Sequence, residues 1–325
     1  MTAVLDIVLG VLVFPGLLFT VAMGFWFEYL ERKVTARIQR RVGPLYAGPH
    51  GLLQPVYDFF KLLLKEEIVP GWTDVFTFRV APILAVTIPV FGMCVLPVAS
   101  TKGLLSFEGD FALVFLLLAL GVLTLSLTGY SVLSPYTAIG VGRLLVQYSM
   151  YEGVFLLSLA SAALQAKTMS FEGILAYQES HGFLGLYQPV SLAAALVALL
   201  AKLEKRPFDL PHAKQEVVAG WMTELSGRGL AFMRLYEDLS MVWGIALIVV
   251  VFLGGPLGPG YKELGALAGF AWFALKSLIV ALAVILVSAT TSRVRVYGLA
   301  EVFWKRVYPL VLLQLVVAFL LGWWA

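Results

Sequence analysis

The chain has 325 residues, of which 60% are hydrophobic and 13% charged, and its formal net charge is +3. A soluble domain carries about 25% charged residues, so this composition excludes an ordinary soluble protein. The apolar runs are continuous, without the alternation of a lipid-facing strand, which excludes a membrane β-barrel. We therefore expect an all-α, polytopic membrane protein.

Runs of about 20 apolar residues predict about eight membrane-spanning helices. We expect them near 3–27, 79–99, 111–133, 143–165, 187–203, 229–253, 264–290 and 304–325. The fifth run is short and is interrupted by Lys202 and Glu204. The first lacks a basic start and a small-residue cleavage site, so it is interpreted as a retained span. No separate soluble domain and no internal repeat is found, and residues 1–325 are expected to form one membrane domain.

A long polar segment, residues 31–70, follows the first span. Gly43 with Pro44, and Gly48 with Pro49, are turn signals that end the first helix. Apolar residues then recur at helical spacing with charges between them, which predicts an amphipathic helix near 51–66 on the membrane surface. This helix is either a surface anchor or part of a mouth for an amphipathic ligand.

A second polar loop is expected near 204–228, between the fifth and sixth spans. Ionisable groups at a membrane boundary are costly and are usually kept to move charge. Glu152 lies inside the fourth span with no basic residue near it in sequence, which favours a role in proton exchange. Glu216 could instead stabilise the first turn of a helix, and Glu237 has the spacing of an ion pair with Arg234. Lys276, alone in the seventh span, either pairs with a carboxylate or reaches the surface.

Basic residues concentrate in the loops after the odd-numbered spans, so the positive-inside rule predicts that these loops are cytoplasmic. Both termini would then be extracytoplasmic, in the inner (plasma) membrane. The single cysteine, Cys94, cannot hold an iron–sulfur cluster or form a disulfide within the chain. His50, His181 and His212 lie on no clear span, which disfavours a haem between helices, and no metal site is expected. Redox centres, if any, would belong to other subunits.

Two segments carry a specific resemblance. The first begins at Glu31 and reads ERK…ARIQRRVGP…GP.GLLQP..D..K…KE, and the second begins at Arg206 and reads RPFDLP.A.QE.VAG..TE.SG. They resemble the two cytoplasmic loops of the H subunit (subunit 1) of respiratory complex I, NADH-quinone oxidoreductase. This family includes the homologous membrane anchor of membrane-bound, energy-converting hydrogenases. The resemblance covers nearly the whole chain.

The resemblance implies a membrane subunit of a multisubunit oxidoreductase and translocase, without a redox centre or a covalently bound cofactor of its own. It implies a cavity through which quinone enters from the lipid, and the first part of a buried carboxylate path that couples electron transfer to proton pumping. The matching cavity residues are Glu31, Arg32, Arg37, Asp58 and Lys61. The matching proton-path residues are Glu152, Glu204, Glu216, Glu224 and Glu237.

The implied partners are a soluble iron–sulfur subunit and a large catalytic-type subunit on the cytoplasmic face, together with antiporter-like and small membrane subunits. No nucleic acid is implied. The chain departs from the family pattern at Lys202, His212 and Lys214, where relatives carry acids.

Two alternatives stay open at this point. One is the anchor of a membrane-bound nickel–iron hydrogenase or ferredoxin-oxidising complex, which couples to proton or sodium translocation without quinone. The exchanged acids favour this alternative, whereas the intact glycine–proline and RPFDLP motifs favour the quinone enzyme. The other is an autonomous secondary transporter or a scaffold, which the missing repeat disfavours. The electron donor, the final acceptor and the transported ion are not determined by the sequence.

Overall fold

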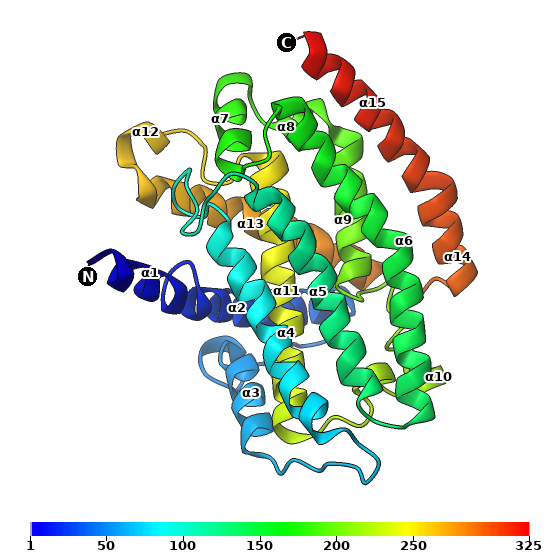
Figure 1. Cartoon of the computed structure of the whole chain (residues 1–325). Coiled ribbons are helices and arrows are strands. Elements are labelled where there is room, and N and C mark those ends of the chain that lie inside the picture. Colours follow the sequence, from blue (N-terminus) through cyan, green and yellow to red (C-terminus); the bar gives the residue numbers. More distant parts are fainter. Residues whose placement is uncertain (1, 325) are drawn as a thin grey trace.

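A computed structural model describes residues 2–324, and the side chains of residues 7–320. Every element in this part of the chain is a helix, apart from an isolated bridge between Thr73 and Val132. The all-α prediction is confirmed. The helices surround α11 (Gly227–Leu253), which runs through the middle of the bundle (Figure 1).

The described residues contain six helical segments that are long and apolar enough to cross a membrane. They are Ile7–Ile38 (α1, Thr2–Leu12, with α2, Leu17–Ile38), α4 (Val75–Val95), α5 (Asp110–Tyr130), α11, α13 (Ala266–Thr290) and Val296–Leu320 (α14, Val296–Ala300; η3, Glu301–Val307; α15, Tyr308–Trp324). A bent pair, α6 (Pro135–Ala166) and α7 (Phe171–His181), makes a seventh. The fifth predicted span is the shorter apolar helix α9 (Pro189–Lys202). Each predicted run is therefore helical, and eight is an approximate count of crossings.

The remaining elements are short and lie between these segments. They are η1 (Pro49–Gly51), α3 (Gln54–Leu64), α8 (Leu184–Tyr187), α10 (Lys214–Val217), η2 (Gly220–Met222) and α12 (Tyr261–Leu264). The amphipathic helix expected near 51–66 corresponds to α3. The polar loop expected near 204–228 corresponds to the connection that contains α10 and η2.

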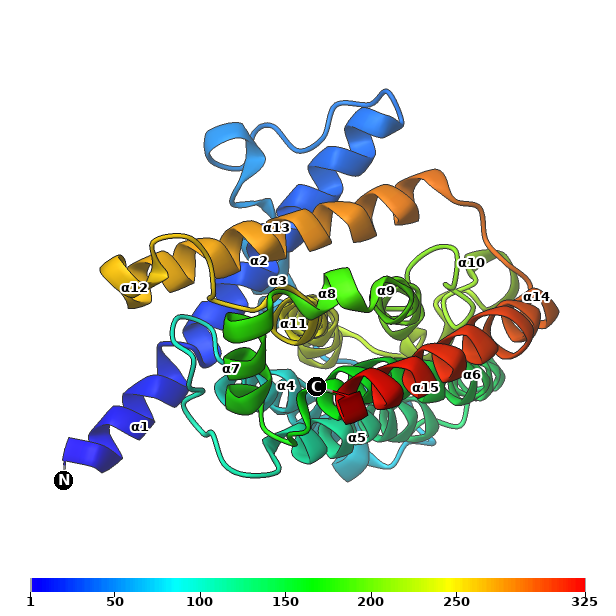
Figure 2. The same ribbon diagram turned by 90° about the horizontal axis from the view of Figure 1, so that it is seen from above.

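The centre of the bundle is packed tightly around α11. Viewed from above, α9 and α11 lie in the middle, with α2 and α13 across one side and α6 and α15 on the other (Figure 2). Gly92 allows α4 to approach closely, because a Cβ there would lie 2.3 Å from the ring of Trp243 on α11. Trp243 is itself fully buried and has no room to move aside.

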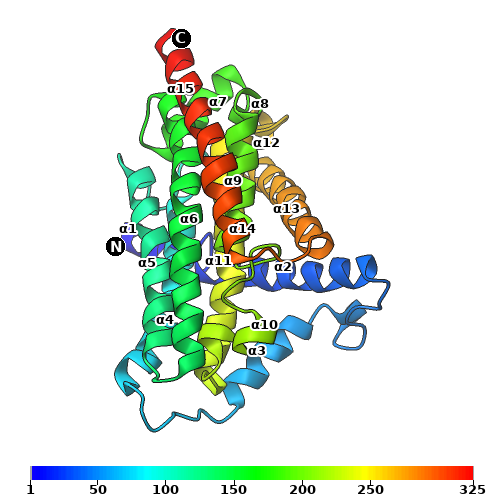
Figure 3. The same ribbon diagram turned by 90° about the vertical axis from the view of Figure 1, so that its right-hand side faces the viewer.

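The helix α2 is oriented differently from its neighbours. It lies across the common direction of α4, α5 and α6, and α3 follows it at the same end of the molecule (Figure 3). Phe25 of α2 and Phe59 of α3 contact each other, with ring centroids 5.8 Å apart. Since α2 and α3 diverge from the main bundle, a space opens between them and α11.

Lys276 of α13 is buried and does neither of the two things that the sequence suggested. Its Nζ donates to the carbonyl oxygens of Gly255 (3.0 Å) and Leu257 (2.5 Å), and it lies 4.6 Å from the centroid of the Phe183 ring. The lysine therefore stabilises the turn that follows α11. It lies apart from the cavity described next.

Candidate functional site: a charged cavity beside α2 and α3

A cavity of about 1340 Å³ lies between α2, α3, α11 and the connection from α9 to α11. The two polar segments that stood out in the sequence, although more than a hundred residues apart, form its opposite walls. Six of the predicted site residues line it: Glu31, Arg32, Asp58, Lys61, Glu204 and Glu237.

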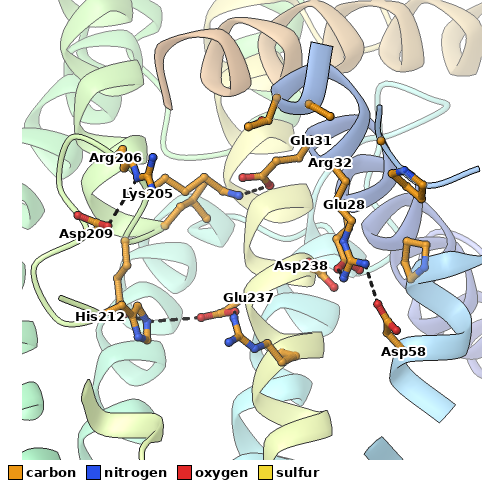
Figure 4. Close-up of a pocket in the computed structure, with 18 of the residues that line it drawn as sticks. Glu28, Glu31, Arg32, Asp58, Lys205, Arg206, Asp209, His212, Glu237 and Asp238 are labelled. Atoms are coloured by element: carbon orange, nitrogen blue, oxygen red, sulfur yellow. Dashed lines mark hydrogen bonds and ion pairs between the residues drawn. The ribbon is translucent and has the colours of Figure 1, made fainter. Parts of the chain in front are cut away.

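An ion-pair cluster holds the first wall together. Arg32 of α2 donates to Asp58 of α3 at 2.6 Å and also pairs with Glu28, one turn earlier on α2 (Figure 4). Asp58 accepts further hydrogen bonds from Gln54 (3.0 Å) and Lys61 (3.3 Å). Partial burial opposes the charge on Asp58, but the hydrogen bonds and the charge of Arg32 outweigh it and lower its pKa. Asp58 is therefore ionised at neutral pH and fixes the guanidinium at the cavity.

Two ion pairs fasten the second wall, the segment after α9. Lys205 pairs with Glu31 of α2 across the cavity (Figure 4). Asp209 accepts two hydrogen bonds from Arg293, at 2.5 and 2.7 Å, in a bidentate arrangement. The hydrogen bond to Asp209 raises the pKa of Arg293. Since Arg293 lies in the connection after α13, this segment is anchored to both an early and a late part of the chain.

His212 lies at the inner end of this wall, between two carboxylates. Its Nε2 is 2.8 Å from Oε2 of Glu204 and 3.5 Å from Oε1 of Glu237. The indole Nε1 of Trp221 donates to Glu204 at 3.2 Å. Burial disfavours the charged imidazole, but the attraction of Glu204 and Glu237 outweighs it and raises the pKa of His212 to about 9. The ring is therefore an imidazolium at neutral pH.

The backbone of this wall is sharply folded. Glu204 follows the last turn of α9 in a left-handed conformation, with φ of 50°. Gly220 also has a positive φ, of 62°, and a Cβ there would lie 1.8 Å from the carbonyl oxygen of Pro211. Only glycine allows the chain to double back this closely. The turn brings Trp221 beside His212, with ring centroids 5.4 Å apart.

Comparison with known proteins identifies the family. The model of the family described as NADH dehydrogenase matches residues 10–319. The chain belongs to the NADH dehydrogenase family. Among its relatives, the H subunit of the NADH-quinone oxidoreductase of Thermomicrobium roseum is 35% identical over 99% of this chain and 97% of its own length. The corresponding H subunit numbered 1 in Geobacter sulfurreducens is 34% identical (94% and 91%), and that of Methylococcus capsulatus is 33% identical (94% and 95%). The resemblance to the H subunit family is confirmed.

Three residues predicted from the NADH dehydrogenase family motifs lie away from the large cavity. Arg37 lines a smaller hollow of about 330 Å³, which shares some lining residues with the large one. Glu216 pairs with Arg143 at 2.5 Å, and more than half of its side chain is exposed. Glu224 makes no hydrogen bond or ion pair with any described residue. The motif positions are thus spread over a wider surface than one cavity wall.

Glu152 is buried in α6, and neither carboxylate oxygen has a hydrogen-bond partner among the described residues. Lys202, at the end of α9, is the cation whose charge acts on both Glu152 and Glu204. Its Nζ lies 5.4 Å from the centroid of the Trp243 ring. The fold therefore supplies the basic neighbour that Glu152 lacks in the sequence.

The structure adds cavity residues that the motif comparison did not select: Glu28, Lys205, Asp209, His212, Asp238 and Arg293. His212 had one sequence signal, since it replaces an acid of the family pattern. Asp209 and Arg293 are 84 positions apart, and no local pattern connects them. Among residues 7–320, no group of three or more His, Cys, Asp or Glu side chains is placed to hold a metal ion.

Proposed function

We propose that this chain is the membrane subunit of an NADH-quinone oxidoreductase, in which the cavity admits the quinone and begins a proton path. The observation that carries the proposal is the cavity of about 1340 Å³, with charged residues on both walls and carboxylates at its inner end. The similarity, over nearly the full length, to H subunits of NADH-quinone oxidoreductases supports it.

The cavity lining suits both parts of a quinone. Phe25, Phe59 and Leu62 provide an apolar side that would accept an isoprenoid tail. Quinone carbonyl oxygens accept hydrogen bonds, and Arg32 and Lys205 provide donors on opposite walls. Glu31, Asp58 and Lys61 hold or flank these donors, and Arg37 would act from the adjoining hollow.

Reduction of a quinone to a quinol takes two electrons and two protons, and each carbonyl oxygen becomes a hydroxyl. The electrons would come from an iron–sulfur cluster on a soluble partner docked at the cavity mouth, because this chain has only one cysteine, the buried Cys94. The cavity carboxylates Glu204 and Glu237 would exchange protons. Glu152 would continue the path inward past Lys202, with Glu216 and Glu224 as candidates nearer the loop surface.

The arrangement of the helices supports a cytoplasmic position for the cavity mouth. The C-terminus lies at the end of the bundle that carries α7 and α8, away from α3 and α10 (Figure 1). Since the loops at the α3 end are rich in basic residues, the positive-inside rule puts that end in the cytoplasm and the C-terminus outside. The N-terminus would also lie outside, in the inner membrane. Antiporter-like and small membrane subunits would pack against the remaining lipid-facing helices.

The test is quinone kinetics in the purified complex with Asp58→Asn. This variant removes the ionised partner of Arg32, and a hydrogen bond to a charged group contributes about 1.5–3 kcal/mol. We therefore expect the quinone KM to rise about tenfold or more while the complex still assembles. The matched control is Lys102→Gln, which removes an exposed ion pair with Glu172 in a loop at the opposite end. Unchanged quinone kinetics in Asp58→Asn would contradict the cavity assignment.

A second function has one specific observation in its favour. His212 and Lys214 line the cavity where the family pattern has acids. This favours the anchor of a membrane-bound hydrogenase or ferredoxin-oxidising complex, which couples to proton or sodium movement without quinone. The same preparation distinguishes the two functions: hydrogen evolution that does not depend on added quinone would select the second.

A further inference from the structure

A single imidazole nitrogen faces two carboxylates that come from different elements. Glu204 follows the end of α9, and Glu237 belongs to α11. The Nε2 of His212 lies 2.8 Å from the first and 3.5 Å from the second, and neither contact has the angle of a directed hydrogen bond. Figure 4 shows the ring of His212 directed across the cavity wall toward Glu237. The contacts are electrostatic, and the nitrogen is committed to neither oxygen.

The orientation of the ring is determined by its other nitrogen. The Nδ1 of His212 lies 3.3 Å from the carbonyl oxygen of Ala219 and donates to it. This contact leaves Nε2 as the atom that faces the acids. The ring of Trp221 lies alongside and donates to Glu204, which limits the approach of solvent.

The two carboxylates differ in their surroundings. The side chain of Glu204 is 9% exposed, whereas that of Glu237 is 30% exposed and lines the open cavity. Arg234 donates to Glu237 at 2.9 Å, and the charge of Lys202 acts on Glu204. His212 therefore lies between an acid in contact with the cavity and a more buried acid that faces the membrane interior.

We propose that His212 is the proton-transferring residue that connects Glu237 at the cavity with Glu204 inside the wall. The proposal rests on the proposed function, because it names the first step of the path leading inward from the cavity.

The step balances without electrons or a further reactant. The Nε2–H bond of the imidazolium breaks, and an O–H bond forms on Oε2 of Glu204, which leaves a neutral ring and a neutral carboxyl group. The neutral Nε2 then takes a proton from the protonated Oε1 of Glu237. One proton has moved inward, and His212 is an imidazolium again. Histidine suits this step because it gains and loses protons near neutral pH, whereas lysine and arginine hold theirs.

The competing explanation is that His212 is a static cation that ties its loop to α11. His212→Lys separates the two explanations, because lysine keeps the positive charge but releases its proton only near pH 10. His212→Gln removes the charge and also the exchangeable proton. His181→Gln is the matched control, since His181 is exposed at the end of α7 and stacks on Tyr177 instead of an acid.

The experiment uses the complete complex in sealed vesicles between pH 6 and pH 9. Electron transfer and proton translocation are measured together. We expect both His212 variants to translocate at least about tenfold fewer protons per electron pair, and His181→Gln to be unchanged. Full translocation by His212→Lys across this range would overturn the proposal and leave a tether.

A second pair of variants keeps the proposal testable if His212→Lys fails to assemble. Glu204→Gln and Glu237→Gln each remove one end of the transfer and leave His212 in place. Each is expected to shift the pH profile of translocation, and unchanged profiles in both would overturn the proposal. The proposed function fails by a separate result, namely an unmodified complex whose electron transfer does not depend on quinone.

Discussion

Replacing His212 with glutamine should destabilise the loop after α9 in a strongly pH-dependent manner. The two carboxylates raise the pKa of His212 in the folded protein to about 9, above its ordinary value of 6.5. The folded state therefore binds this proton more tightly than the unfolded state does. The resulting stabilisation is fully present below about pH 6.5 and is lost as the pH rises through about 9.

The size of the effect follows from the same two values. Each pKa unit corresponds to about 1.4 kcal/mol, so the gap corresponds to about 3 kcal/mol at pH 6. The side chain of His212 is only 20% exposed, so solvent screens this interaction weakly. At pH 10 the two proteins should differ by less than about 1 kcal/mol, the contribution of the remaining hydrogen bond to Ala219.

The assay is unfolding in mixed micelles at pH 6, 8 and 10, followed by tryptophan fluorescence. Trp221 contacts His212 and reports the detachment of this loop directly. His181→Gln again serves as the control, because His181 contacts no carboxylate. A stability difference of the same size at all three pH values would refute the reasoning, since it would mean that the ion pairs with Glu204 and Glu237 contribute nothing.

Three further predictions concern other parts of the molecule. Glu152→Gln should reduce proton translocation by about tenfold or more without loss of assembly, and unchanged coupling in vesicles would contradict a proton-path role. Gly92→Ala should cost about 1–3 kcal/mol in unfolding free energy because its Cβ meets a buried tryptophan ring. Gly142→Ala, with open space around its Cβ, is the control and should be neutral or stabilising. Arg293→Lys should lose the bidentate contact with Asp209, about 1–3 kcal/mol, and speed hydrogen exchange in residues 203–213; unchanged exchange would show that the contact does not anchor this segment.

Much of the architecture follows from the sequence because a bilayer leaves few choices. Backbone groups in lipid must be hydrogen-bonded within the segment, so a long apolar run becomes a helix wherever it occurs. The amphipathic pattern near 51–66 identified α3 for a similar reason, since its period matches the two environments on its sides. The spacing of Arg234 and Glu237 likewise predicted their ion pair, which forms at 2.9 Å. These are local properties, and local patterns encode them.

The cavity depends on contacts that no local pattern contains. Asp58 meets Arg32 because α3 folds back on α2, and Asp209 meets Arg293 across 84 positions. Lys276 illustrates the same limit, since the sequence suggested a carboxylate partner and the fold supplied two carbonyl oxygens instead.

The sequence by itself determined the membrane class, the approximate number of spans, the two polar segments that form the cavity and the family. It could do so because hydrophobic run lengths and motifs are read along the chain. The tertiary structure alone decided which charges meet: it set Lys202 near Glu152, and His212 between Glu204 and Glu237. Electrostatic interactions depend on distance in space and on burial, and neither is written in the order of residues.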